Sequence, residues 1–564
     1  MNKPYPLYNV CEAYSTIKET VVERAKVLGD QIAYSYREKP NDKKKLSVSY
    51  REFSEQVKAF GTELLSRNIG RGRCAVIGKL SYSWVLTYFS VLSIGSVLVP
   101  LDPDWTSEDL LDALKKSNVD MVICDIDVAD KIADYFTERD IKPVFTKKTD
   151  GECVLDLVDL GRKRVESGDN SFDFVESDPE EMSLLVFTSG TTGQGKGVML
   201  SEKAILVTVS EGMKLVKIGN KMIAVLPPHH TFGSTISILG GYYLGIEVYI
   251  SNGIRYFQHE LQQERPEGLI LVPLFLETFA KKIMANVKEQ GKEKVLNGLV
   301  KVSNVMRKVG INFTKQMFST VLKAFGGNLK YVIVGGAPLS AEVYNFFSSF
   351  GIKVINGYGI TECSPLISVN RNDHIVPGTV GMPIKCDTIK IDNPNEDGEG
   401  EICVKGPNVM LGYYQNEEAT KAVIDDEGFF HTGDIGKIHE SGYLIITGRI
   451  KNLIILSNGK NVYPEEIECT LSSVPGLSDI VVYEGVSKRG IEHNTIVAEV
   501  WIEPEAREKL GIDDVEAYIK PYIHKYNLTA VSYKKIGMLK VRNEPFPKNT
   551  LKKIVRFKID KTID

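Results

Sequence analysis

The sequence predicts an α/β protein with a large N-terminal domain of doubly wound α/β subdomains. Short apolar runs alternate there with helical stretches, a pattern typical of sheets covered by helices on both faces. From residue 387 onward the pattern changes to short strands with Gly-rich turns, which indicates a β-rich subdomain. A chain of 564 residues is also too long for a single hydrophobic core. The expected strands of the first domain lie at 75–77, 97–99, 121–124, 223–226, 269–272 and 331–334.

A smaller α+β domain is expected to begin after Gly448 and Arg449, where the strand pattern changes again. We therefore expect an N-terminal domain over residues 1–449, with the β-rich subdomain at about 387–448. Residues 450–564 are expected to form the small C-terminal domain.

Residues 80–101 contain no charged residue and are long enough to span a bilayer. Several serines, Gly95 and Pro100 interrupt this stretch. The pattern therefore predicts a helix over 84–94 and a strand over 96–99, packed in a core.

The composition is that of an ordinary globular protein, with 43% hydrophobic and 25% charged residues. A formal net charge of -4 argues against a general nucleic-acid binder, so no nucleic-acid partner is expected. The eight cysteines include no C-x-x-C pair, and neither a disulfide framework nor a zinc site is predicted. The first residues, MNKPYPLYNV, lack the apolar segment of a signal peptide, and the expected location is the cytoplasm.

Residues 184–201, LLVFTSGTTGQGKGVMLS, join an apolar run to a loop rich in glycines and hydroxyls. Such a loop can hold a phosphate, because backbone N–H groups, hydroxyls and a lysine point towards the anion. The spacing nearly matches a P-loop, but Gly197 stands where that motif needs Ser or Thr. Residues 198–200 predict a strand and Ser201 a helix N-cap, so we expect a strand-loop-strand unit. The candidate phosphate-binding residues are Thr188, Ser189, Gly190, Thr191, Thr192, Gly193 and Lys196.

The segment TSGTTGQGKGV resembles the signature loop of the AMP-forming synthetase superfamily, which contains acyl-CoA synthetases, peptide-synthetase adenylation domains and luciferases. In one departure, Gly195 stands where that family usually has proline. The resemblance covers most of the chain from about residue 180 to its end. Further segments that resemble the family follow in its order at 226–233, 334–340, 356–362, 400–414, 429–436, 448–467 and 547–556.

The resemblance implies a site for ATP and Mg²⁺. Glu362 matches the family's magnesium carboxylate, and Thr361 beside it matches a phosphate ligand. Tyr358 is expected to offer its ring to the adenine, and Asp434 its carboxylate to the ribose hydroxyls. Arg449 resembles the family arginine that meets the ribose or a phosphate. The residues expected to complete the nucleotide pocket are Gly335, Gly336, Ala337, Asn356, Gly357 and Gly359.

The segment PFPKNTLKKIVR resembles the family's C-terminal catalytic motif and places Lys553 on the lysine that bridges the substrate carboxylate and the α-phosphate. Lys552 replaces the usual glycine of that motif. The resemblance also implies that the C-terminal domain rotates between two half-reactions, about a hinge near Lys451. Gly459 is expected to line the tunnel through which the pantetheine arm of CoA enters.

Residues 226–233 bear on the identity of the acid. The superfamily's amino-acid-activating members carry Asp after the Phe of this segment, whereas Gly233 stands here and supplies no anchor for an ammonium group. His230 matches the family's position beside the acyl carboxylate, and an ordinary core histidine is the alternative. Gly233, Gly240 and Gly241 are expected to leave room for an acyl chain.

Residues 275–330 form a mostly helical excursion with eleven Lys or Arg against three Glu. The excursion resembles the long-chain fatty-acyl branch of the superfamily. A solvated helix face is one interpretation of these charges. Contact with a membrane surface or with cofactor phosphates is the other.

The expected function is that of an AMP-forming acyl-CoA synthetase, which uses ATP, Mg²⁺ and CoA to activate a medium- or long-chain fatty acid. Two alternatives share the first step: transfer to an acyl carrier protein, or activation of another hydrophobic or aromatic carboxylic acid. A non-catalytic nucleotide-binding regulator would have lost Lys553 or Glu362, and both are present. Peripheral contact with the inner face of the membrane is a further hypothesis.

Overall fold

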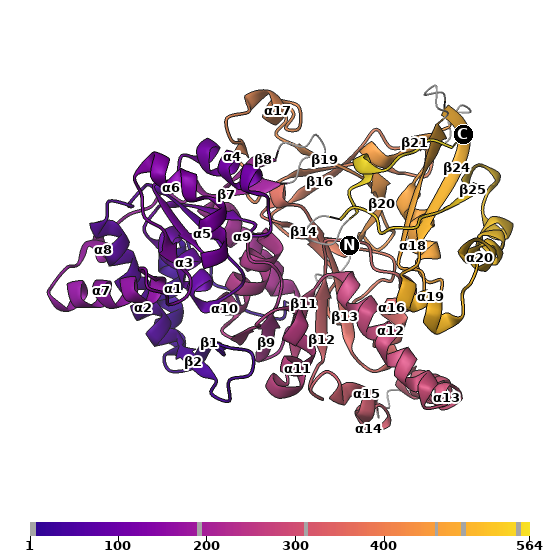
Figure 1. Cartoon of the computed structure of the whole chain (residues 1–564), viewed down its shortest axis with the longest axis horizontal. Coiled ribbons are helices and arrows are strands. Elements are labelled where there is room, and N and C mark those ends of the chain that lie inside the picture. Colours follow the sequence, from indigo (N-terminus) through magenta and orange to yellow (C-terminus); the bar gives the residue numbers. More distant parts are fainter. Residues whose placement is uncertain are drawn as a thin grey trace.

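The computed structural model describes residues 7–188, 195–308, 314–456, 461–486, 492–548 and 554–563. Figure 1 shows a large mixed α/β body, coloured indigo to orange, and a smaller group of strands and helices at one end, coloured towards yellow. The predicted α/β fold class is confirmed.

One sheet carries the strands that flank the predicted phosphate loop. Its described strands follow the order β18-β8-β7-β4-β3-β5-β6. Strands β3, β4 and β5 are parallel, as expected for a doubly wound sheet, whereas β7 and β8 are antiparallel with Thr188 opposite Lys196. The predicted strand-loop-strand unit is therefore confirmed. The bounds are β18 Gly412–Tyr413, β8 Lys196–Ser201, β7 Met182–Thr188, β4 Val97–Leu101, β3 Arg73–Ile77, β5 Met121–Cys124 and β6 Val144–Phe145.

A second sheet supplies two strand ends to the site. Its described order is β15-β14-β13-β12-β11-β9-β10-β1-β2, and the strands from β13 to β1 are parallel. Ligands of such sheets bind beyond the carboxyl ends of the strands. The bounds are β15 Met382–Pro383, β14 Leu366–Val369, β13 Lys353–Gly359, β12 Tyr331–Val334, β11 Gly268–Leu271, β9 Lys221–Ala224, β10 Glu247–Ile250, β1 Ile32–Tyr36 and β2 Leu46–Ser49.

Three smaller sheets occupy the rest of the described chain. The first is antiparallel in the order β16-β17-β19-β20, and the others are β21-β22 and β23-β24-β25. The bounds are β16 Thr388–Asp392, β17 Gly400–Lys405, β19 Phe430–Ile438, β20 Leu444–Arg449, β21 Ile454–Ile455, β22 Asn461–Val462, β23 Asp479–Val486, β24 Glu492–Trp501 and β25 Ile536–Val541.

The helices pack around these sheets (Figure 1). Ser201 accepts a hydrogen bond from the backbone N–H of Ala204, which confirms it as the N-cap of α9. A π-helix spans Phe232–Leu239. The α-helices are α1 Ile17–Leu28, α2 Tyr50–Ser66, α3 Tyr82–Ser93, α4 Ser107–Ser117, α5 Ile126–Lys131, α6 Ala133–Arg139, α7 Val154–Glu166, α8 Ser171–Phe174, α9 Glu202–Leu215, α10 Gly240–Leu244, α11 Ile254–Glu264, α12 Pro273–Glu289, α13 Glu293–Lys308, α14 Thr314–Met317, α15 Ser319–Lys323, α16 Ala341–Ser349, α17 Glu417–Lys421, α18 Pro464–Leu471, α19 Pro504–Leu510 and α20 Val515–Thr529.

Aromatic rings lie at the centre of the main core. Tyr34 and Tyr242 stack with their ring centroids 5.9 Å apart, and Phe53 meets Phe89 edge to face at 5.1 Å. Each such pair contributes about 0.5–1.5 kcal/mol beyond the burial of its area. Phe89 also meets Tyr242 at 5.1 Å, so these contacts connect β1, α2, α3 and α10 into one core.

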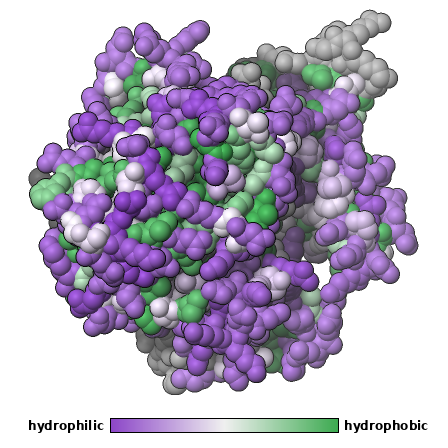
Figure 2. Space-filling model, turned by 60° about the vertical axis from the view of Figure 1, so that its left-hand side comes forward, coloured by the Kyte–Doolittle hydropathy of each residue, from purple (hydrophilic) through white to green (hydrophobic). Residues whose placement is uncertain are grey.

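The uncharged stretch at 80–101 lies inside this core. It forms α3 and β4, as predicted, and every residue of α3 is buried. None of the described helices is both long enough and apolar enough to cross a membrane. On the face shown in Figure 2, hydrophilic residues predominate and hydrophobic residues form small patches among them.

Candidate active site

The described edges of the phosphate loop are Thr188, the last residue of β7, and Lys196, the first residue of β8. The hydroxyl of Thr188 donates a hydrogen bond to the Lys196 carbonyl at 3.4 Å. The antiparallel pairing of the two strands brings both ends of the loop together. Five of the predicted loop residues lie outside the described part of the chain: Ser189, Gly190, Thr191, Thr192 and Gly193.

Tyr413 joins the phosphate loop to the predicted magnesium carboxylate. The ammonium of Lys196 lies over the Tyr413 ring, 4.5 Å from its centroid, and the Tyr413 hydroxyl donates to Glu362 Oε1 at 2.9 Å. Burial, and then the Glu362 charge, raise the pKa of Tyr413, so its hydroxyl remains a donor. Tyr413 lies within the matching segment at 400–414, but its contact with Glu362 spans 51 positions and no local pattern predicts it.

Glu362 and Thr361 lie in a short 3-10 helix, Thr361–Cys363, that follows β13. The Glu362 carbonyl accepts a hydrogen bond from the Met410 backbone N–H at 2.8 Å, which fixes the residue from its main chain as well as its side chain. A carboxylate, connected through Tyr413 to Lys196 at the start of β8, offers the oxygen ligand that Mg²⁺ prefers. The residues present therefore fit the predicted ion.

The carboxylate of Asp434 is the centre of the second part of the site. It is 2% exposed, and it accepts a hydrogen bond from the Tyr358 hydroxyl at 2.7 Å. Its other oxygen lies 2.7 Å from Nε of Arg449, the residue opposite it on β20. Burial, and then the Asp434 charge, raise the pKa of Tyr358. The structure thus brings together the residues predicted for adenine, ribose and phosphate.

An apolar cavity of about 70 Å³ lies at the carboxyl ends of β12 and β13. Five predicted nucleotide-pocket residues line it: Gly335, Gly336, Gly357, Tyr358 and Gly359. The other lining residues are Gly212, Met213, Val216, Phe232, Ile236, Ile333, Val334, Pro365, Leu366 and Val369. Ala337 and Asn356 do not line the cavity: Ala337 is exposed beyond β12, and the Asn356 amide donates to the Thr379 carbonyl at 3.3 Å.

The expectation that Gly233, Gly240 and Gly241 leave room for an acyl chain is wrong. A Cβ at Gly233 would lie 2.2 Å from the Pro227 carbonyl oxygen, and one at Gly241 would lie 2.5 Å from a Val248 methyl carbon. At Gly240 a Cβ would lie 2.3 Å from the end of Met213. These glycines permit close packing of the chain and do not line the cavity.

His230 is half-buried two residues before the π-helix and is not among the residues that line the cavity. Its ring lies 4.3 Å from the ring of His229, measured between centroids. Nε2 of His229 is in turn 3.4 Å from a carboxylate oxygen of Asp102, which follows β4. Asp102 and His229, far apart in the sequence, thus form a buried pair beside His230. The periodicity of apolar residues along the sequence could not predict this pair.

The C-terminal part contacts the large body through α12 and β20. The Lys281 ammonium donates to the Leu477 carbonyl at 3.1 Å, and Lys509 pairs with Glu289 at 3.4 Å. Lys451 lies in the 3-10 turn Ile450–Asn452 that directly follows β20. Lys553 and Gly459, predicted for catalysis and the pantetheine tunnel, lie outside the described residues.

The ends of β7 and β8, the carboxylates of Glu362 and Asp434 and an apolar cavity thus form an arrangement that is typical of a nucleotide-binding enzyme. A model of the family described as AMP-binding enzyme matches residues 21–414. The chain belongs to the AMP-binding enzyme family. The resemblance inferred from its motifs is confirmed, and its relatives support the predicted enzyme class, an acyl-CoA synthetase.

Curated relatives extend over most of the chain. Long-chain-fatty-acid–CoA ligase 5 of Rattus norvegicus is 27% identical over 507 residues, which cover 84% of this chain and 74% of the relative. Long-chain-fatty-acid–CoA ligase FadD15 of Mycobacterium bovis is 26% identical, and the match covers 82% of this chain and 78% of the relative. A probable acyl-activating enzyme 16 of Arabidopsis thaliana is 27% identical, and the match covers 95% of this chain and 86% of the relative.

Solved structures share the fold. ATP-bound MatB from Rhodopseudomonas palustris matches with a TM-score of 0.74 and 22% identity, over 96% of this chain and 97% of that chain. The anthranilate CoA ligase AuaEII in complex with anthranoyl-AMP matches with a TM-score of 0.77 and 18% identity. This match covers 97% of this chain and 96% of that chain.

Proposed function

We propose that this protein activates a medium- or long-chain fatty acid with ATP to give acyl-AMP and pyrophosphate, and then transfers the acyl group to CoA with release of AMP. The observation that carries the proposal is the position of an apolar cavity beside Tyr358, whose hydroxyl bonds to Asp434. An adenylate bound along Asp434 and Tyr358 would direct its acyl group towards apolar walls. The long-chain ligases among the relatives support this substrate class.

The first half-reaction is an in-line attack of the substrate carboxylate on the α-phosphate of ATP. Catalysis of this step depends on positioning and on charge stabilisation. In the proposal the loop at 188–196 holds the β- and γ-phosphates, and Asp434 and Arg449 hold the ribose. Mg²⁺, bound by Glu362, would neutralise negative charge on the phosphates when present. Lys553 would bridge the carboxylate and the α-phosphate.

The second half-reaction requires a thiol to reach the acyl-adenylate. We propose that residues 450–564 rotate about Lys451, which removes Lys553 from the site and brings Gly459 to the pantetheine tunnel. The boundary after Arg449 fits the short 3-10 turn that connects β20 with β21. We further propose a cytoplasmic location.

A pyrophosphate-release assay with ATP, Mg²⁺ and a panel of carboxylic acids tests the function. We expect turnover with medium- or long-chain fatty acids in the presence of CoA and formation of the acyl-CoA. Product formation with a holo acyl carrier protein and not with CoA would support the carrier-protein alternative. Preference for an aromatic acid would support the other alternative. No release with any acid would contradict the proposal.

Val216, at the end of α9, is the position from which we expect acid length to be controlled. Val216→Phe should fill the cavity and lower kcat/KM for the longest accepted acid by about tenfold, because each excluded methylene is worth roughly tenfold or more. Val216→Ala should shift the preference towards longer acids. The measurement is the kcat/KM profile over a series of straight-chain acids.

The opposite directions of the two Val216 substitutions provide the control. Simple damage to packing would lower activity for all acids in both variants. An unchanged length profile in both would place the acyl chain elsewhere.

Peripheral membrane contact is proposed for α13. This helix exposes Val295, Val302 and Val305 together with Lys294 and Lys301, an apolar and basic surface suited to anionic lipid. Lys281 on α12 is engaged with the C-terminal part, and the side chains of Arg307, Lys308 and Lys315 lie outside the described set.

The double substitution Lys294→Glu and Lys301→Glu should weaken binding to anionic vesicles at low salt by about thirtyfold or more. The reason is that each basic residue near such a surface is worth about 1 kcal/mol. Wild-type binding should vanish at high salt. Lys421→Glu on α17 is the matched control. Absence of wild-type co-sedimentation at low salt would show that these lysines form only a solvated helix face.

A further inference from the structure

Asp434 lies in an irregular part of the β-rich sheet. On β17 the paired residues Glu401 and Cys403 are two positions apart, whereas their partners on β19, Ile435 and His431, are four positions apart. Three residues, 432–434, therefore bulge out of the ladder, and Gly433 at their centre has a φ of +70°. Bulges next to active sites redirect side chains. This bulge presents Asp434 to Tyr358 and Arg449.

Side-chain hydrogen bonds hold the bulge at two points. The Thr432 hydroxyl donates to the Ile402 carbonyl at 2.7 Å and accepts from the Asp434 backbone N–H at 3.0 Å. The backbone N–H of Gly433 donates to Glu401 Oε1 at 2.9 Å. Glu401 thus replaces the ladder hydrogen bond that the bulge removes from the residue directly before Asp434.

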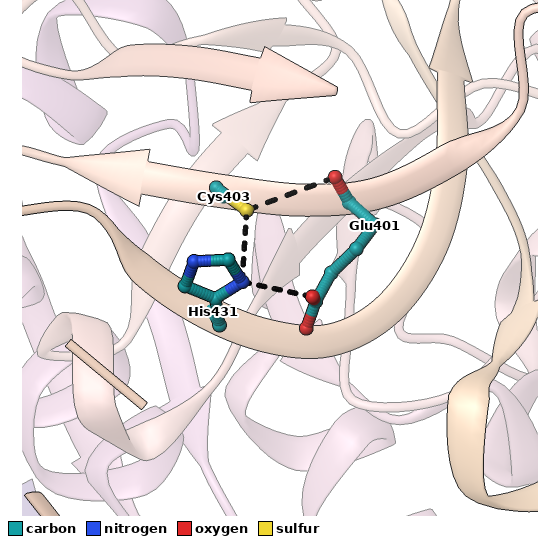
Figure 3. Close-up of side chains that lie close together, drawn as sticks. All are labelled: Glu401, Cys403 and His431. Carbon is teal, nitrogen blue, oxygen red and sulfur yellow. Dashed lines mark hydrogen bonds and ion pairs between the residues drawn. The ribbon is translucent and has the colours of Figure 1, made fainter. Parts of the chain in front are cut away.

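His431 holds the other oxygen of Glu401 (Figure 3). Nδ1 of His431 lies 2.8 Å from Glu401 Oε2, and on the far side of the ring Nε2 lies 3.4 Å from Asp425. The Glu401 hydrogen bond, together with the nearby carboxylate charges, raises the pKa of His431 despite its partial burial. The imidazole therefore fixes the carboxylate in the orientation that bonds Gly433.

We propose that Glu401, held by His431, is a positioning residue for nucleotide binding, which fixes the bulge at 432–434 so that Asp434 meets the ribose. The inference rests on the proposed function of Asp434. Glu401 acts through the backbone of Gly433 and does not itself touch the nucleotide. Its loss should weaken binding of ATP without affecting the acid.

The same cluster has a competing interpretation as a metal site. Glu401, Cys403 and His431 each offer a ligand atom, and these atoms lie within 4.8 Å of one another. Thiol, imidazole and carboxylate are zinc ligands. The Cys403 thiol is engaged within the protein, since its Sγ lies 3.4 Å from Nδ1 of His431 and 3.8 Å from the Glu401 carbonyl oxygen. Both Glu401 oxygens are moreover engaged by Gly433 and His431, so we favour positioning.

The test is the Kd of ATP measured by titration calorimetry in the absence of acid, together with KM for ATP and for the acid. Glu401→Ala should raise the Kd and KM of ATP about tenfold and leave KM for the acid unchanged, because a charge-assisted hydrogen bond is lost. Glu401→Gln should restore ATP binding to within about threefold, since its amide oxygen can accept from Gly433 and its NH₂ can donate to neutral His431. Glu396→Ala, an exposed acid nearby, is the matched control.

A double-mutant cycle makes the test specific. In an Asp434→Ala background, Glu401→Ala should have little further effect on ATP binding, because the two residues act in series. Equal effects in both backgrounds, or a general loss of thermal stability in place of weaker ATP binding, would overturn the proposal. The proposal would also be overturned if Cys403→Ala weakened ATP binding as much as Glu401→Ala does and the purified protein contained stoichiometric zinc.

Failure of the proposed function gives a different result. A wild-type protein that binds ATP but activates none of the acids refutes the catalytic proposal, and the calorimetric cycle still decides the role of Glu401. A wild-type protein that does not bind ATP refutes both.

Discussion

Lys553→Ala is expected to slow acyl-adenylate formation by roughly a hundred- to a thousandfold, the usual loss when one preorganised transition-state donor is removed. Thioester formation from preformed acyl-AMP should be retained, because the lysine acts only in the first half-reaction. The described flanks of this segment are anchored: Lys548 pairs with Asp479 at 2.7 Å, and Arg556 pairs with Glu468. The substitution should therefore leave the fold intact. Single-turnover formation of acyl-AMP is the measurement.

Lys552→Ala is the matched control, since the family motif has glycine at that position and two lysines are adjacent here. It should retain adenylation within about threefold, because a lysine that makes no transition-state contact contributes little to the barrier. If Lys552→Ala abolished the first half-reaction and Lys553→Ala did not, the assignment of the bridging lysine would be wrong.

Lys451→Pro is expected to separate the two half-reactions. Proline fixes φ at residue 451 and disfavours the helical conformation of Ile450, which lies in the 3-10 turn Ile450–Asn452. A backbone conformation that proline cannot adopt costs about 3 kcal/mol, which corresponds to roughly a hundredfold in rate. One half-reaction should fall by this factor while the other changes little. Adenylation and thioester formation are measured separately, the latter from preformed acyl-AMP.

Lys451→Ala removes the side chain and keeps the backbone freedom, so it should support both half-reactions. If Lys451→Pro slowed both steps in parallel in a folded protein, the rotation would take place about another residue. Circular dichroism of the variant shows whether it is folded.

Local patterns in the sequence were sufficient for the strand-loop-strand unit at 182–201. The apolar run, the glycines and the N-cap Ser201 all act over a few residues, and the structure has the two strands and the N-cap in the expected place. Tyr358 and Asp434 were found through motifs, and the structure brings them within hydrogen-bonding distance across 76 positions. Their proposed contacts with the nucleotide are still predictions.

Tertiary contacts decided the features that the sequence could not predict. Whether a glycine lines a cavity or permits close packing depends on which atoms face it, and at Gly233 these belong to the Pro227 backbone. The position of the Tyr413 side chain likewise depends on its hydrogen bond to Glu362, 51 positions away. The bulge at 432–434 depends on the register between β17 and β19, which no local pattern specifies.

Each oxygen of the Asp434 carboxylate has a partner from its own chain, the Tyr358 hydroxyl on one oxygen and the Arg449 guanidinium on the other. A carboxylate has about four acceptor sites, so the hydroxyls of an incoming ribose could bond beside these two donors to an anion that is already held in place. Preorganisation of this kind lowers the cost of binding, because the carboxylate need not be ordered when the nucleotide arrives. Because Arg449 directly precedes the 3-10 turn of Lys451, the same ion pair also ties the start of the proposed hinge to the proposed ribose site.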